Sequence, residues 1–190
     1  MKKIGSVKED LTTEKRISIT PETVKKFTDS NFSIFLEKKY GEHLGITDDE
    51  YKNEGATLYD SAKEVLEKSQ IILKVNCPSN DEINSIQDKS ILIGQFDPLS
   101  DKERLNKLIK KNINIFSLNL LPRITRAQSM DVLSSQANLA GYRAVIETVE
   151  EFGKAVPMMM TAAGTITPAK VLVIGAGVAG LQAIATAKRL

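Results

Sequence analysis

The chain has 190 residues, of which 42% are hydrophobic and 26% are charged, and its formal net charge is +2. This composition is typical of a globular chain that forms one domain, or one domain and a portion of a second. The 26 basic and 24 acidic residues are well mixed and form no basic stripe with interleaved aromatic residues, which argues against nucleic-acid binding. The single cysteine, Cys77, excludes an internal disulfide and is typical of a reducing compartment.

Short strands and helices alternate along the first two thirds of the chain. Helix starts are predicted at Thr20-Pro21 and at three capping boxes, which begin at Thr47, Ser61 and Ser100. Because the strands lack a clean polar face, they favour a parallel sheet covered by helices on both sides. The expected strands are 4–7, 32–37, 56–59, 71–75, 90–96 and 113–118, with one possible helical turn at 81–86.

A polar stripe follows Leu121-Pro122. A long helix is predicted from Gln128 to Phe152, ended by Gly153, and 154–170 is expected to be a connector. Gln128, Asp131, Ser135 and Asn138 would share one face of this helix, with Ser134 beside them and Arg123 and Arg126 just upstream. The small residues Ala137, Ala140 and Gly141 would allow a close backbone approach. Such a stripe is either a solvated face or a set of groups that hydrogen-bond an amide or a ribose.

The most informative motif is a G-x-G-x-x-G sequence that lies between an apolar run, Val171–Ile174, and an Ala-rich helix, Leu181–Leu190. In a strand–turn–helix context, Gly175 allows a tight turn, Gly177 lets the backbone approach a pyrophosphate, and Gly180 allows close helix packing. The phosphates would lie on free N–H groups at the helix N-terminus. The alternative is a glycine-rich turn that binds nothing.

These elements together predict an α/β chain. A Rossmann-like parallel-sheet lobe is expected over residues 1–125. Residues 126–190 would form an interdomain helix and the truncated start of a second Rossmann dinucleotide-binding lobe, with its first strand and a partial helix. The acidic residue that holds a ribose is expected about 20 residues after the glycines, so we expect this chain to be a piece of a longer protein and to be inactive alone.

Three stretches resemble a known family: IILKVNCP, PRITRAQSMDVLSSQANLAGYRAV and PMMMTAAGTITPAKVLVIGAGVAGLQAIATAKRL. They are similar to the NAD(H)-binding domain of the alpha subunit of the proton-translocating NAD(P) transhydrogenase, and the likeness extends over essentially the whole chain. The resemblance implies an enzyme that passes hydride from NADH to NADP+ held on a partner beta subunit. It further implies a homodimer, coupling to proton movement through a membrane-spanning part, and a cytoplasmic location at the inner membrane.

The same resemblance implies the site residues. Arg123, Gln128, Asp131 and Ser134 match family positions that approach the nicotinamide, and Gln128, Asp131 and Arg123 are the catalytic candidates. The pyrophosphate loop matches Gly175, Gly177, Val178, Ala179 and Gly180. No metal site is expected.

Alanine dehydrogenase, a cousin family, offers the main alternative. Such an enzyme protonates a carbonyl oxygen and needs an acid–base group, whereas hydride transfer between two nicotinamides needs positioning and exclusion of water. The segment that matches the cousin's histidine region, LIGQFDPLS, contains Gln95 and no histidine, and His43 is expected to be exposed. Arg16 and Lys74 match the cousin's substrate-binding pair and are interpreted as structural ion-pair positions. A third possibility is a fragment that binds no nucleotide.

Overall fold

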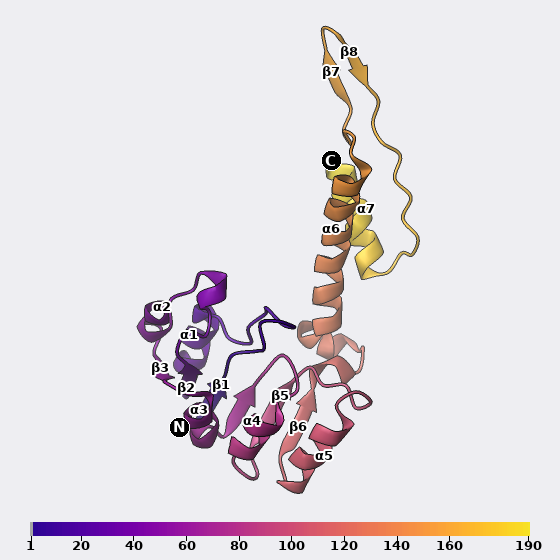
Figure 1. The fold of residues 1–190 in the computed structure, drawn as a ribbon. Coiled ribbons are helices and arrows are strands. Elements are labelled where there is room, and N and C mark those ends of the chain that lie inside the picture. The colour runs from indigo at the N-terminus through magenta and orange to yellow at the C-terminus, as the bar shows by residue number, and fades with distance from the viewer. Residues whose placement is uncertain (1) are drawn as a thin grey trace. The chain divides into compact units, whose positions relative to one another are not determined.

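The computed structural model describes residues 2–190 and divides into two compact units (Figure 1). The first unit ends at Leu121, and the second spans Pro122–Leu190. A six-stranded sheet forms the first unit, whereas the second contains two packed helices and a two-stranded hairpin. Across residues 2–190, none of the helices combines the length and the apolar character needed to cross a bilayer.

All strands of the first unit belong to one parallel sheet, as predicted. They pair in the order β3-β2-β1-β4-β5-β6, so the strand order reverses between β1 and β4. The register places Ile4 of β1 opposite Ile34 of β2 and Ile71 of β4. The strands are β1 (Lys2–Ser6), β2 (Phe32–Glu37), β3 (Ala56–Tyr59), β4 (Ile71–Leu73), β5 (Ile91–Gly94) and β6 (Asn114–Ser117).

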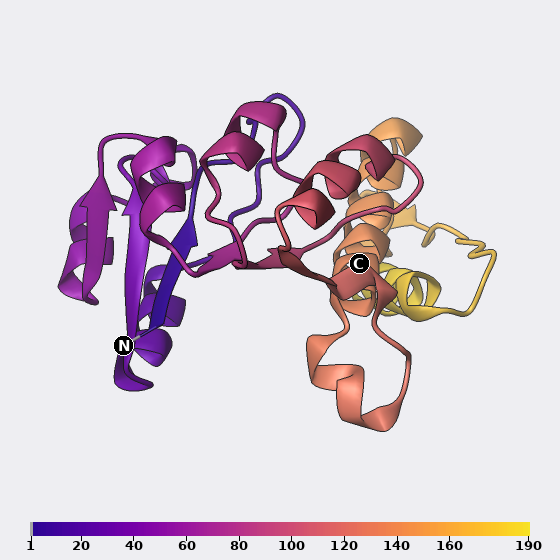
Figure 2. The ribbon, with the colours of Figure 1, turned by 90° about the horizontal axis from the view of Figure 1, so that it is seen from below.

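Helices cover both faces of this sheet (Figure 2). Val24 of α1 and Tyr51 of α2 are buried in the cluster on one face. Val65 of α3, Ile83 of α4 and Leu108 of α5 are buried in the cluster on the other. Because both faces are covered, the strands are apolar on both sides, which explains the lack of alternation in the sequence. The helical segments of this unit are α1 (Pro21–Asp29), η1 (Glu42–Leu44), α2 (Asp48–Asn53), α3 (Ala62–Lys68), α4 (Asn80–Ser85), α5 (Lys102–Lys110) and η2 (Leu118–Leu120).

Most of the predicted helix starts are confirmed. The Thr20 side chain caps α1, with Pro21 in the first turn. Thr47 and the Glu50 side chain form a complete capping box at α2. At α3 the Ser61 hydroxyl accepts a hydrogen bond from the backbone N–H of Glu64. Local side-chain chemistry therefore sets where these helices begin.

The predicted capping box at Ser100 is wrong. Helix α5 begins after Asp101, and the Ser100 hydroxyl instead donates a 3.0 Å hydrogen bond to the Asp97 carboxylate. A complete box that was not predicted from the sequence forms at α4, where Ser79 and Glu82 satisfy each other's backbone N–H groups. The competing carboxylate of Asp97 is the physical reason for the difference.

The second unit contains η3 (Thr125–Met130), α6 (Val132–Phe152), β7 (Met159–Thr161), β8 (Gly164–Ile166) and α7 (Val178–Arg189). The prediction of one helix from Gln128 is wrong, because α6 starts at Val132. Asp131 has non-helical backbone angles, φ −76° and ψ 86°, and caps α6 by accepting a hydrogen bond from the Ser134 N–H. Gln128 lies in the preceding 3₁₀ turn, so it does not share a helical face with Asp131.

Two further features of the second unit differ from expectation. The connector 154–170 contains the antiparallel β7–β8 hairpin, in which Met159 pairs with Ile166. The apolar run Val171–Ile174 is not a strand, because no other strand pairs with it within residues 2–190. Strand formation needs a hydrogen-bonding neighbour as well as an apolar, β-branched sequence.

Candidate functional site

The glycine-rich turn before α7 is folded tightly onto that helix. Gly175 has a φ of 103°, a left-handed conformation that favours glycine. A Cβ on Gly180 would overlap the carbonyl oxygen of Gly175 and lie 2.9 Å from its carbonyl carbon, so this packing requires a glycine. A Cβ added to Gly177 would meet no atom within 4 Å, which leaves its backbone open to approach by a ligand.

The first turn of α7 lies directly after this glycine turn. Gly177 is the N-cap residue and forms no side-chain hydrogen bond to the helix. The first helical bond runs from the Leu181 N–H to the Gly177 carbonyl, at 2.9 Å. The N–H groups of Val178, Ala179 and Gly180 therefore have no partner inside the helix. Such N–H groups, aligned with the helix dipole, favour a bound phosphate or other anion.

A second group of polar residues surrounds the start of α6. Asp131 accepts hydrogen bonds from the Ser134 backbone N–H, at 2.9 Å, and from the Ser134 hydroxyl, at 2.6 Å. These bonds, and to a smaller extent the charge of Arg123, lower the pKa of the Asp131 carboxyl. The carboxylate is therefore ionised at neutral pH and held in a fixed orientation by its own helix.

Arg123 and Gln128 lie near this pair, and both side chains are exposed. The backbone carbonyl of Gln128 accepts a hydrogen bond from the Asp131 N–H, at 3.3 Å, which joins the 3₁₀ turn to α6. The four predicted nicotinamide-end residues thus belong to one short segment of the second unit. The exposed amide and guanidinium groups are available to bind a ligand.

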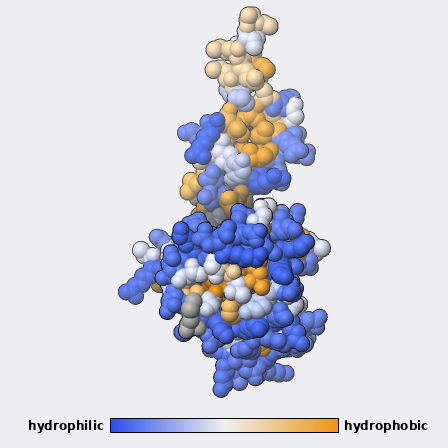
Figure 3. Space-filling view, turned by 90° about the vertical axis from the view of Figure 1, so that its left-hand side faces the viewer, coloured by the Kyte–Doolittle hydropathy of each residue, from blue (hydrophilic) through white to orange (hydrophobic). Residues whose placement is uncertain are grey.

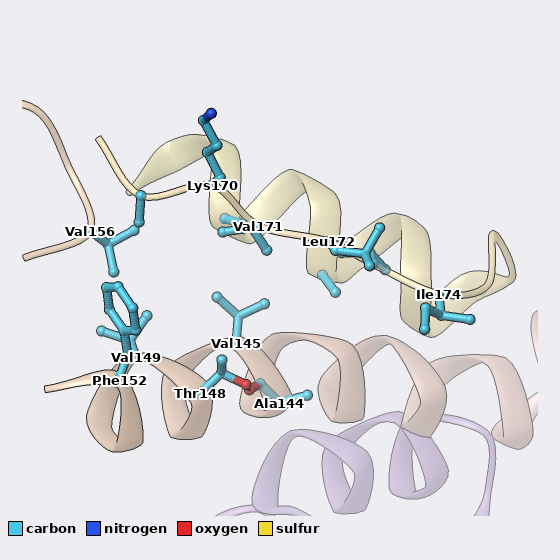
Figure 4. Close-up of a pocket in the computed structure, with 14 residues that line it drawn as sticks. Ala144, Val145, Thr148, Val149, Phe152, Val156, Lys170, Val171, Leu172 and Ile174 are labelled. Atoms are coloured by element: carbon cyan, nitrogen blue, oxygen red, sulfur yellow. The ribbon is translucent and has the colours of Figure 1, made fainter. Parts of the chain in front are cut away.

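An apolar groove lies further along the same unit (Figure 4). Its volume is about 350 Å³, and Val145 and Val149 of α6 line it together with Ala183 of α7. Its outer wall is the segment with Leu172 and Ile174, which are 86% and 92% exposed. Figure 3 also shows hydrophobic side chains gathered over the helical part of this unit. A groove with this lining can pack apolar side chains, and Lys170 is its one charged lining residue.

A polar pocket of about 670 Å³ lies in the first unit, where β1, β4 and β5 end. This edge includes the reversal of strand order between β1 and β4, which is where open α/β sheets bind ligands. Lys74 is buried here, and its Nζ lies 2.6 Å from the Glu82 carboxylate and 3.7 Å from that of Glu9. Glu9 also accepts a 2.7 Å hydrogen bond from the Val75 N–H. Burial raises the pKa of Glu9, whereas Lys74 opposes this rise.

Glu9 and Glu82 were not identified from the sequence as partners of Lys74. Their positions directly after β1 and in the first turn of α4 were the available signal, because side chains that follow parallel strands meet at one edge of the sheet. Arg16 is likewise paired within the chain. Its guanidinium donates bidentate hydrogen bonds to the Glu14 carboxylate, from Nε at 2.9 Å and from Nη2 at 2.6 Å. The interpretation of Arg16 and Lys74 as ion-pair positions therefore agrees with the geometry.

The remaining chemically reactive side chains do not form a catalytic group. His43 is exposed, and its Nε2 lies 2.8 Å from the Lys15 carbonyl oxygen. Burial raises the pKa of the Cys77 thiol to about 11, so the thiol is protonated and unreactive at neutral pH. Within residues 2–190, no three histidine, cysteine or acidic side chains are grouped as a metal site would require.

Comparison with known proteins identifies relatives over the whole chain. The family model described as the alanine dehydrogenase/PNT N-terminal domain matches residues 5–140, and the C-terminal domain model of that family matches residues 144–190. An NAD(P) transhydrogenase alpha subunit from Rhodospirillum rubrum is 47% identical over 99% of this chain and 50% of its own length. The chain therefore spans about half the length of the curated relatives it matches.

Solved structures confirm the Rossmann-like α/β fold. A transhydrogenase from Sinorhizobium meliloti is 45% identical, with a TM-score of 0.93, over 99% of this chain and 56% of that one. An L-alanine dehydrogenase matches 98% of this chain and 52% of its own with a TM-score of 0.82, but at 23% identity this likeness shows the fold alone. These matches confirm the predicted resemblance to the transhydrogenase alpha subunit.

Proposed function

Because the chain belongs to the alanine dehydrogenase/PNT family, we propose that it forms the NAD(H)-binding part of a transhydrogenase that passes hydride from NADH to NADP+. The observation that supports this most directly is the glycine turn of the second unit. Gly180 leaves no room for a Cβ and Gly177 faces open space, which supports the role of this turn in binding a pyrophosphate. We therefore assign the phosphates of the dinucleotide to this turn.

The proposed roles follow from this placement. Gly175, Gly177 and Gly180 shape the loop, and the N–H groups of Val178 and Ala179 bind the pyrophosphate. The nicotinamide end would meet the residues around the start of α6. Gln128, with its exposed amide, binds and orients the carboxamide, while Arg123, Asp131 and Ser134 fix the surrounding hydrogen bonds.

Bound NADH supplies the hydride, and the protein supplies the geometry. The residues around the nicotinamide hold the ring in one orientation and limit the access of water, which is what transfer between two rings requires. No protein group has to give or take a proton in this step. The polar pocket of the first unit has Gln95, and not a histidine, at the position that matches the histidine region of alanine dehydrogenase, which supports this proposal over amino-acid oxidation.

The wider assembly is also proposed. NADP(H) would be bound by a partner beta subunit, and a membrane-spanning part would couple hydride transfer to proton translocation. We further propose a homodimer that is peripheral to the cytoplasmic side of the inner membrane through its partners. Residues 1–125 and 126–190 would be the two functional lobes. Relatives named as a subunit alpha support the existence of partner subunits.

The test is to isolate the native assembly and follow hydride transfer from NADH to an NADP+ analogue whose reduced form absorbs at a distinct wavelength. We expect transfer that requires the partner and does not require an amino acid. Formation of NADH from NAD+ only when alanine is added would instead support the amino-acid dehydrogenase. An assembly that binds no NADH, measured by nucleotide fluorescence, would refute both.

A further inference from the structure

The two helices of the second unit are in tight contact at Gly141. A Cβ built on Gly141 would overlap the carbonyl oxygen of Ala179 and lie 2.9 Å from its carbonyl carbon. The atom in the way is backbone, at the first turn of α7, so it cannot move aside as the end of a flexible side chain could. Only glycine at this position lets α6 rest against the start of α7.

The contact at Gly141 also fixes where the two polar groups lie relative to each other. The helices run side by side in the same direction (Figure 1), and Ala179 belongs to the glycine turn's own helix. Ser134 lies on the part of α6 that extends beyond the start of α7, and Asp131 caps that end of the helix. With a rise of 1.5 Å per residue, the seven positions from Ser134 to Gly141 correspond to about 10 Å along α6.

We propose that Gly141 is a positioning residue that sets the distance between the pyrophosphate-binding turn and the nicotinamide-binding start of α6. This inference rests on the function proposed above. Because the first residues of α7 hold the phosphates and the first residues of α6 hold the nicotinamide, one dinucleotide contacts both only if the helices keep this offset. Gly141 touches neither end of the nucleotide and acts through Ala179.

The substitution Gly141→Ala tests the proposal. We expect it to be harmful, whereas the same substitution at a helix position without close neighbours is favourable. Alanine in place of glycine within a helix normally stabilises it. Here the added methyl group must push α7 away from α6, so the nucleotide loses contacts at one end. We expect NADH to bind about tenfold more weakly, which equals about 1.4 kcal/mol and matches the loss of one polar contact.

The affinity for ADP distinguishes a change in the offset between the two helices from a distortion of the glycine turn itself. ADP contains the pyrophosphate but not the nicotinamide, so its affinity should change little in Gly141→Ala if only the offset is altered. Equal losses for NADH and ADP would overturn the proposal, since they would mean that the glycine turn itself is distorted. An unchanged affinity for NADH would also overturn it.

The neighbouring substitution Ala140→Gly is the matched control. Ala140 is exposed on the same helix, and its replacement lowers helix propensity without adding an atom near Ala179. Both variants are made in the native assembly, and the fraction of binding-competent protein is taken from the titration amplitude. We expect Ala140→Gly to reduce stability but to leave both nucleotide affinities at the wild-type value. A wild-type assembly that binds no NADH would refute the proposed function itself, which is a different outcome from either result above.

Discussion

Replacing Lys74 by methionine should destabilise the first unit strongly while leaving nucleotide binding intact. Lys74, Glu9 and Glu82 lie together at the end of β4, and the side chains of Lys74 and Glu9 are both 4% exposed. At an effective dielectric constant near 20, the 2.6 Å contact to Glu82 represents roughly 6 kcal/mol of attraction, much of which desolvation offsets. Removing the cation leaves these carboxylates without a positive charge nearby, and breaking a buried ion pair in this way typically costs about 3–5 kcal/mol.

Differential scanning calorimetry measures this loss. At about 4 °C per kcal/mol, a loss of about 3 kcal/mol lowers the unfolding midpoint of the first unit by roughly 12 °C at neutral pH. The double variant Lys74→Met/Glu9→Gln is the control, because it also removes a buried charge and should recover some of the loss. NADH affinity should stay at the wild-type value, since the proposed nucleotide site lies in the second unit.

The pH dependence gives a second check. Burial already raises the pKa of Glu9 above its ordinary value of 4.5, and Lys74 limits this rise. A carboxyl with a raised pKa contributes stability that is present below 4.5 and is lost as the pH rises through the folded-state value. The Lys74→Met defect should therefore be largest at neutral pH and smaller near pH 4.5. A defect below about 1 kcal/mol, or one that does not change with pH, would refute this account of the ion-pair cluster.

Three further predictions concern the second unit. Gln128→Ala should slow hydride transfer more than it weakens NADH binding, because the amide orients the ring; single-turnover rates and fluorescence titration separate the two, and weaker binding at an unchanged rate contradicts the role. Asp131→Ala should speed amide hydrogen exchange at the start of α6, whereas Asp131→Asn keeps the cap. Because hydrogen bonds lower the pKa of Asp131, the extra protection of the wild type over Asp131→Asn should be complete above pH 3.8 and lost as the pH falls through the lower folded value. Equal exchange in Asp131→Ala and Asp131→Asn argues against the cap. Gly180→Ala should weaken NADH binding about tenfold or more by opening the turn at Gly175, and a titration that shows wild-type affinity rules this out.

The sheet of the first unit could be predicted from sequence because its strands are short apolar runs between well-marked helices. The ends of the strands were less predictable. The run 90–96 was expected to be a strand, whereas β5 covers Ile91–Gly94. Strand ends depend on which backbone groups find partners in the neighbouring strand, and that information is not local to the sequence.

Helix caps, like strand ends, could be predicted only in part from the local sequence. Thr47 and Glu50 form the predicted box, but Ser100 does not, because Asp97 competes for its hydroxyl. The pattern at Ser79 and Glu82 was present in the sequence and was missed. A capping signature therefore predicts a helix start only when no neighbouring carboxylate takes the hydroxyl.

The candidate site could be predicted in composition but not in geometry. Asp131 was expected on a helical face and instead precedes the helix as its N-cap, because its carboxylate accepts hydrogen bonds from Ser134. The importance of Gly141 could be suspected from its small size, yet the overlap with Ala179 depends on how two helices pack. Packing between elements distant in sequence is the information that a local pattern lacks.

The strand order also has a consequence for synthesis on the ribosome. Strand β1 is made well before one of its two partners in the sheet, β4, which begins at Ile71. Roughly 65 residues separate Ser6 from Ile71, and translation at about 5–20 residues per second takes about 3–13 seconds to make them. Throughout that interval the hydrogen-bonding edge of β1 is open to any other extended chain. Translation must reach β4 before both edges of β1 are protected.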